Sequence, residues 1–292
     1  MCIRDSPYVP PHPWALDFPH LMLRGKAIAY QEKNKSLKQR ARDSALTSTD
    51  SLGKLMKLPL VDITYEAISK SPKARKIASK ITGVHEEAPW PNFEKSVKTY
   101  IPKSIENVTA TDRTTGKVAL FTGCYCRNND AELANDLLKV FEHNNIETRV
   151  ILDDKCCGMP KLDLGDLKSV ENLMKHNVPK LLQEIDEGFD IISLVPSCVL
   201  MFKQELPLLF DENDDLKKIK QHIFDPFEYL SDRESKGLMN KSFKNSLGKI
   251  AYQVACHQRV QNIGPKTKEL LEMVPDTDCL LYTSDAADDP TC

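Results

Sequence analysis

The sequence predicts an α/β fold with two related parallel-sheet modules, the second one truncated, preceded by a mainly helical N-terminal arm. Three observations lead to this prediction. After Gly116, short apolar runs rich in β-branched residues alternate with longer amphipathic runs. The segment from Gly116 to Cys124 resembles the one from Gly248 to Cys256, because each is an apolar run that ends in a cysteine. Before residue 110, the apolar residues have helical spacing.

The two ends of the chain resemble translated sequencing adapter. We therefore interpret residues 1–6 and 279–292 as adapter-derived and expect residues 7–278 to be a fragment of a longer native protein. Three of the nine cysteines fall in these ends, and the other six lie between positions 124 and 256. The clustering of those six cysteines therefore belongs to the native part.

Composition restricts the class of protein. A chain of 292 residues with 41% hydrophobic and 28% charged residues predicts a globular protein of about two domains. No apolar run reaches the roughly 18 residues of a membrane-spanning helix, and charges of both signs are mixed, which argues against a nucleic-acid binder. Neither a G-x-S-x-G nor a phosphate-binding G-x-x-x-x-G-K motif is present. Without a secretory signal, reduced cytosolic thiols are expected.

The arm, residues 7–110, begins with a proline-rich stretch and continues with helical apolar spacing. Ser48, Thr49 and Asp50 offer helix-capping oxygens before an apolar stripe, which predicts a helix at about 50–70. This helix could pack on the protein or lie on a membrane surface, and the sequence leaves both interpretations open.

The first module is expected to span residues 111–210, with a linker and the truncated second module over 211–278. Its predicted strands are 117–122, 147–152 and 190–195, and amphipathic helices connect them. Asn129 and Glu132 form a capping pair for the first of these helices, which the Asn144–Asn145 pair ends. Right-handed crossovers would place the strands in one sheet.

A cysteine follows each predicted strand. Cys124 follows the first strand, the Cys156–Cys157–Gly158 run follows the second, and Cys198 follows the third. Ligands bind at the carboxyl ends of strands in an open parallel sheet, so the four sulfurs are expected to converge there. Gly158 permits a turn that a side chain would obstruct. Cys126 alternates away from Cys124 and is expected to be an ordinary buried thiol.

Four thiolates with few histidines favour an iron–sulfur cluster over a structural zinc site, which more often uses C-x-x-C pairs or histidine. The adjacent Cys156 and Cys157 suit two irons of one cluster. Four cysteines could hold a cubane or a two-iron cluster, so the cluster type stays open. A zinc-stabilised binding module without redox chemistry remains an alternative.

The cysteine series resembles the CCG cysteine-rich domain of the heterodisulfide reductase family. Residues 7–278 as a whole are similar to the family of iron–sulfur subunits that includes that of anaerobic glycerol-3-phosphate dehydrogenase. The motifs that carry this resemblance are residues 8–12, 17–24, 157–162, 196–201 and Cys256–His257. The resemblance implies a ferredoxin-like part before the arm and two CCG modules after it, with Cys256 as a ligand in the second module.

The resemblance also implies a function. It predicts an electron-transfer subunit, not itself catalytic, with a [4Fe-4S] cluster held by Cys124, Cys156, Cys157 and Cys198. A flavoprotein dehydrogenase subunit would supply electrons, and a quinone or another acceptor would receive them. It further implies cytoplasmic location, with peripheral attachment to the inner face of the membrane, and no nucleic-acid partner.

The sequence departs from the family pattern at several positions. Ser6 stands before Pro7 where the family has a cysteine, and Met201 stands at the second cysteine position of the closing C-x-x-C. Met201 argues against the alternative of a catalytic heterodisulfide reductase, which uses a fifth cysteine. His257 could donate a hydrogen bond near a cluster or be an ordinary loop histidine. Lys161 is expected to be a solvated surface lysine, although it could offset cluster charge.

Overall fold

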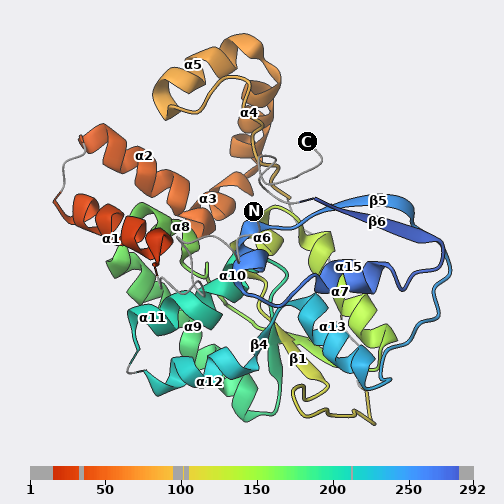
Figure 1. Ribbon diagram of the computed structural model, residues 1–292. Helices are drawn as coiled ribbons and strands as arrows, with labels where there is room; N and C mark the ends of the chain where they lie inside the picture. The colour runs from red at the N-terminus through yellow and green to blue at the C-terminus, as the bar shows by residue number, and fades with distance from the viewer. Residues whose placement is uncertain (1–15, 33–35, 95–100, 102–104, 212, 283–292) are drawn as a thin grey trace.

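A computed structural model describes residues 16–32, 36–94, 101, 105–211 and 213–282 (Figure 1). Its centre is a four-stranded parallel sheet with the order β2-β1-β3-β4. The α/β prediction is confirmed. The strands are β1 (Lys117–Leu120), β2 (Glu147–Val150), β3 (Asp190–Ile192) and β4 (Ile223–Phe224).

The three expected strands begin at the predicted residues and end two or three residues early, because the chain then turns into loops and short helices. Strand β4 was not predicted and lies beyond residue 210, where we expected the first module to end. It pairs with β3 through Ile191 and Ile223, so the first sheet continues past that boundary.

Helices cover both faces of this sheet (Figure 1). Alternate residues of β1 point to opposite faces, as strand geometry requires: Ala119 packs in one core cluster, and Val118 and Leu120 pack in the other. The first cluster includes residues of α8 (Met159–Leu164), α9 (Leu167–Asp186) and α12 (Asp214–His222). The second includes residues of α7 (Ala131–His143), α13 (Pro226–Ser235) and α15 (Lys266–Leu271).

Helix α7 has a different cap from the one that we predicted. The Asp130 carboxylate accepts the Leu133 N–H at 3.2 Å, so the N-cap is Asp130, whereas the Asn129 side chain donates to the Asn92 carbonyl oxygen. The predicted end is confirmed, since Asn144 is the C-cap and Asn145 has a φ of 53°.

Two short helices follow β1 and β3 directly. They are α6 (Gly123–Asn128) and α10 (Pro196–Leu200), and α10 continues into a π-helical turn, η2 (Met201–Glu205), and then into α11 (Leu206–Leu209). Both helices start where their strand leaves the sheet, so they carry Cys124 and Cys198 to the same edge.

The arm is helical, as predicted. It consists of α1 (Phe18–Gln31), α2 (Leu37–Thr47), α3 (Thr49–Met56), α4 (Pro59–Lys70) and α5 (Pro72–Thr82). The helix expected at 50–70 is two helices, because Leu58 is extended before Pro59, which opens α4. Helices α1 and α2 pack against α8 and α3 packs against α6, whereas α4 and α5 project away from the sheet (Figure 1).

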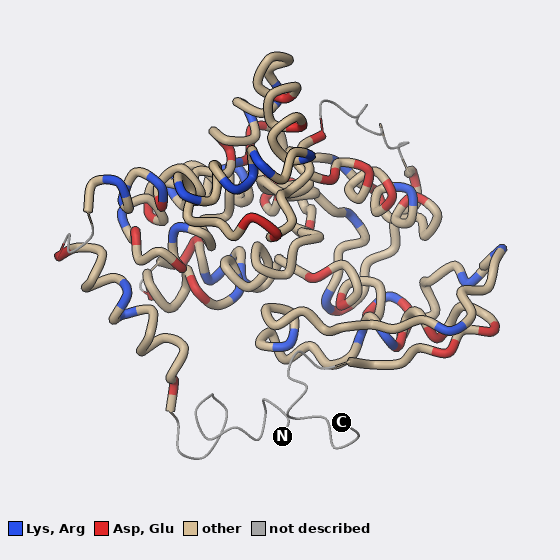
Figure 2. The backbone as a smooth tube through the Cα atoms, turned by 90° about the horizontal axis from the view of Figure 1, so that it is seen from above, with Lys and Arg blue, Asp and Glu red and all other residues tan. Residues whose placement is uncertain are grey.

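The region after residue 247 repeats the strand–cysteine–helix order at the start of the first module. Strand β5 (Gly248–Gln253) leads into α14 (Cys256–Val260) and pairs in parallel with β6 (Thr277–Tyr282) in a separate two-stranded sheet. Strand β6 runs into the segment that we interpret as adapter-derived. Over most of the described chain, basic and acidic residues are interspersed (Figure 2).

Candidate metal centre

Four thiols meet at the carboxyl edge of the first sheet. Cys124 Sγ lies 3.7 Å from Cys156 Sγ, and the Cys157 thiol makes hydrogen bonds to both Cys156 and Cys198. Cys156, Cys157 and Cys198 are each only 3% exposed. The structure therefore brings together the cysteines that the sheet topology predicted would converge, while their binding of a metal stays a prediction.

The four sulfur atoms make contact in series, from Cys124 through Cys156 and Cys157 to Cys198. Within the described ranges, no group of three or more His, Cys, Asp or Glu side chains is arranged to hold one metal ion. A series of thiols from three loops instead suits a group of several metal atoms, each bound by one or two sulfurs.

The thiols are electrostatically unequal. Hydrogen bonds from the Cys124 and Cys157 thiols lower the pKa of Cys156 far below its ordinary value, and the Gly158 N–H adds to this effect. Donating those hydrogen bonds raises the pKa of Cys124 and of Cys157, and burial adds to both shifts. These hydrogen bonds thus favour the thiolate form at Cys156, and binding of metal would release the protons held by Cys124 and Cys157.

Two glycines make the close approach of these loops possible. Gly158 has a φ of 103°, and a Cβ there would lie 3.4 Å from Met201 Cε. Gly123, which the sequence analysis did not single out, has a φ of 62°, and its Cβ would lie 3.3 Å from Cys198 Sγ. Since side chains rarely adopt such φ values, glycine shapes both cysteine loops.

A carboxylate network ties the cysteine loops to each other and to the arm. Asp154 accepts the Gly123 N–H at 2.8 Å and pairs with Arg127. Arg127 also pairs with Asp50 of the arm at 3.4 Å, and Asp50 accepts the Cys156 N–H at 2.8 Å. Burial raises the pKa of Asp154, and Arg127 partly offsets that rise. The network thus links α3 with the loops after β1 and β2.

Three more residues that the sequence analysis singled out, Lys161, His257 and Cys256, differ in exposure and in hydrogen bonding. Lys161 is only 9% exposed and donates to Ser48 Oγ at 3.2 Å, so the expectation of a solvated surface lysine was wrong. His257 Nδ1 lies 2.7 Å from the oxygen of Ser197, the residue before Cys198, so this histidine is hydrogen-bonded to a cysteine loop. Cys256 is exposed, at the first position of α14, the helix that packs against α10.

Two further sulfur-containing side chains, those of Cys126 and Met201, are buried near the site. Cys126 is 2% exposed and packs in the core cluster on the α7 side of the sheet, so its predicted burial is confirmed. Met201 is fully buried in the opposite cluster, and its methyl group faces Gly158. Met201 therefore packs against the Cys156–Cys157–Gly158 loop from inside the protein.

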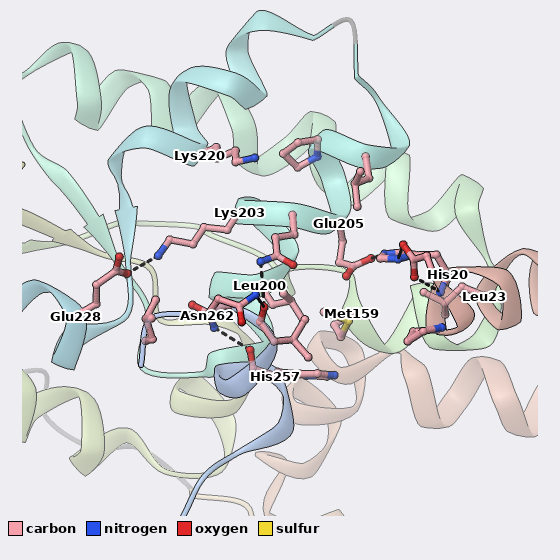
Figure 3. A pocket seen from close by; sticks show the side chains of 18 of the residues that line it. His20, Leu23, Met159, Leu200, Lys203, Glu205, Lys220, Glu228, His257 and Asn262 are labelled. Atoms are coloured by element: carbon pink, nitrogen blue, oxygen red, sulfur yellow. Dashed lines mark hydrogen bonds and ion pairs between the residues drawn. The ribbon is translucent and has the colours of Figure 1, made fainter. Parts of the chain in front are cut away.

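A cavity of about 1340 Å³ opens beside this edge (Figure 3). Met159, next to the Cys–Cys–Gly run, and Leu200, in α10, both line it. On one side, the His20 ring lies between Asp17 at 2.6 Å and Glu205 at 3.0 Å. Burial would lower the pKa of His20, but the two carboxylates outweigh burial and raise it. The sequence analysis missed this cavity because its walls come from segments far apart in the chain.

Comparison with known families supports the assignment of the first module. Residues 118–203 match the Cysteine-rich domain family CCG. This range includes strands β1, β2 and β3 and the four converging cysteines. The resemblance that the cysteine series indicated is confirmed for this part of the chain.

Curated relatives cover more of the chain at lower similarity. The C subunit of anaerobic glycerol-3-phosphate dehydrogenase from Escherichia coli strain K12 is 24% identical over 236 residues, which is 80% of this chain and 58% of that protein. The B subunit of fumarate reductase (CoM/CoB) from Methanothermobacter marburgensis is 26% identical over 54% of this chain and 29% of its own length.

An uncharacterized iron-sulfur protein of Methanocaldococcus jannaschii is 24% identical over 66% of this chain and 34% of its own length. No solved structure matches the chain. The chain thus spans little more than half the length of the first of these relatives and about a third or less of the other two.

Proposed function

We propose that this chain is an iron–sulfur electron-transfer subunit of a flavoprotein dehydrogenase complex. The observation that carries the proposal is the contact among four thiols, three of them buried, at one sheet edge inside the segment that matches the CCG domain. The similar proteins are named as subunits of a dehydrogenase and a reductase and as an iron-sulfur protein, which supports the same role.

The residues present fit a cluster. Cysteine thiolates are the usual ligands of iron–sulfur clusters, and Cys124, Cys156, Cys157 and Cys198 supply four of them. Bound there, a [4Fe-4S] cluster would supply reversible electron transfer. The protein residues exclude water by burial, Gly158 donates its N–H to Cys156, and the carboxylate network holds the loops in place.

The proposal also names the electron donor and acceptor, a second cluster and the cellular compartment. A flavoprotein subunit would supply the electrons, and a quinone or another acceptor would receive them. Cys256 would be a ligand of a second cluster. A reducing, cytoplasmic compartment suits so many free thiols.

The first test is metal analysis of the chain reconstituted without oxygen in the presence of iron and sulfide. We expect iron and labile sulfide in near-stoichiometric amounts and an EPR signal from the cluster in its paramagnetic state. A parallel sample treated with iron but no sulfide is the control, and it should lack that signal. Zinc bound without sulfide would contradict electron transfer and favour the zinc-stabilised binding module, and a chain that binds no metal would contradict both.

We also propose peripheral attachment to a membrane through α4 and α5. Ile77 and Ile81 lie one helical turn apart on α5 and are 63% and 64% exposed, and Leu60 and Ile63 of α4 are similarly exposed. Helix α5 carries four basic residues and no acidic one. Apolar side chains beside basic ones suit a surface of anionic lipid. In the described segments, no helix is long and apolar enough to span a bilayer.

Flotation with vesicles that contain anionic lipid tests this attachment. The Ile77→Asp/Ile81→Asp variant should bind at least about tenfold more weakly, because it removes two apolar contacts and adds two negative charges. Ile28→Asp is the matched control, since Ile28 is 57% exposed but lies on α1. Equal binding of all three proteins would rule out attachment through α5.

A further inference from the structure

Helix α3 of the arm begins directly against the cysteines. It packs on α6, the helix that carries Cys124, and Asp50 in its first turn accepts the Cys156 N–H at 2.8 Å. The approach is close, because a Cβ on Gly53 would lie 2.2 Å from Asn128 Cγ of α6. The first turn of α3 is therefore fixed on the cysteine loops from two sides.

Thr49, the first residue of α3, has a hydroxyl group without an ordinary partner. Its Oγ1 atom is buried and has no hydrogen bond of normal geometry. The hydroxyl nevertheless lies within reach of the Cys124 and Cys156 thiols. The next residue, Asp50, accepts the Cys156 N–H at 2.8 Å, which fixes the start of α3 on that cysteine loop. A buried hydroxyl that lacks a partner costs stability, and a sulfur atom of the neighbouring cysteine loops is an acceptor that would satisfy it.

The start of α3 has further unusual features. The N-cap residue, Ser48, makes no side-chain hydrogen bond to the first turn, and its hydroxyl instead accepts a hydrogen bond from Lys161. Lys161 follows the Cys–Cys–Gly run and is nearly buried. Thr49 thus lies between Ser48, which holds Lys161 of α8, and Asp50, which holds the Cys156 N–H.

We propose that Thr49 is a positioning residue for the cluster, whose hydroxyl donates a hydrogen bond to a ligand sulfur, that of Cys156 or Cys124, and raises the reduction potential. This inference rests on the function proposed above and adds the arm to the site. A donor to a ligand sulfur withdraws electron density and stabilises the reduced cluster, which is more negative than the oxidised one.

The test compares Thr49→Val, which keeps the shape and removes the donor, with Thr49→Ser, which keeps the hydroxyl. Each full-length protein is reconstituted, and its reduction potential is measured by anaerobic redox titration with EPR detection. In Thr49→Val, the ratio of reduced to oxidised cluster at a fixed potential should fall about three- to tenfold, where tenfold corresponds to 59 mV for one electron. Thr49→Ser should stay within about twofold of the unaltered protein.

Thr64→Val is the matched control. The Thr64 hydroxyl donates to the Leu60 carbonyl oxygen within α4, away from the cysteines, so its loss should leave the potential unchanged. A cluster lost from Thr49→Val but kept in Thr49→Ser would also support contact between the hydroxyl and the site. Unchanged potential in Thr49→Val, or equal loss of iron from both Thr49 variants, would overturn the proposal.

Failure of this inference is distinguishable from failure of the proposed function. If the unaltered chain takes up no iron and sulfide, the electron-transfer function fails. If the unaltered chain takes up both and Thr49→Val has the same potential, only the role of Thr49 fails.

Discussion

The Cys156→Ser and Cys157→Ser variants are each expected to lose at least about nine-tenths of the iron and labile sulfide bound by the unaltered chain. Each change removes a thiolate and leaves a hydroxyl of similar size, so the fold should persist. Cys156 accepts hydrogen bonds from two neighbouring thiols and Cys157 joins it to Cys198, so either change interrupts the series of sulfurs. Iron and sulfide analysis after anaerobic reconstitution measures the loss.

Cys126→Ser is the control for these variants. Cys126 is buried like Cys156 and Cys157, but it packs in the core cluster on the other side of the sheet. The Cys126→Ser variant should keep its iron and sulfide. Its free energy of unfolding should fall, because a hydroxyl replaces an apolar thiol in the core. Equal cluster loss in all three variants, or retention in both Cys156→Ser and Cys157→Ser, would contradict the assigned ligands.

Gly165→Ala is expected to lower the free energy of unfolding by about 2–5 kcal/mol and to displace the arm. Gly165 ends α8 with a φ of 88°, and a Cβ there would lie 2.6 Å from the Lys26 carbonyl oxygen of α1. The left-handed backbone costs an alanine about 1–2 kcal/mol, and the clash with α1 backbone adds about 1–3 kcal/mol. Urea unfolding measures the total, and faster proteolysis between α1 and α2 reports the displaced arm.

Gly188→Ala separates the two contributions. Gly188 has nearly the same φ, 84°, but no atom lies within 4 Å of the Cβ that alanine would add. This variant should lose only about 1–2 kcal/mol and keep the arm protected from protease. Equal losses in the two variants would show that close packing of α1 on Gly165 does not hold the arm.

The sheet and the meeting of the cysteines could be predicted because both follow from local patterns. Apolar and β-branched residues gather in the segments 117–122, 147–152 and 190–195, which identifies the strands, and parallel connections place the carboxyl ends of β1, β2 and β3 at one edge. A cysteine follows each of these strands in the sequence. The meeting of Cys124, Cys156, Cys157 and Cys198 at that edge could therefore be predicted without knowing how side chains pack.

Features that depend on contacts distant in sequence could not be predicted. Asp50 resembles a helix-capping residue locally, but its carboxylate accepts the N–H of Cys156, 106 residues away. Strand β4 has only two residues, too few for a period-2 pattern, and pairing with β3 defines it. Lys161 is buried because α8 lies under the arm, and no local pattern encodes that cover.

The position of α3 also determines the order in which the site assembles. The arm precedes every cysteine loop in the chain, so the ribosome makes it first, yet α3 packs on α6 and on the loop that contains Cys156. That surface exists only after β1, β2 and their connections have folded. The cover is therefore synthesised first but can dock only after those loops have folded, so the cysteines stay uncovered until then.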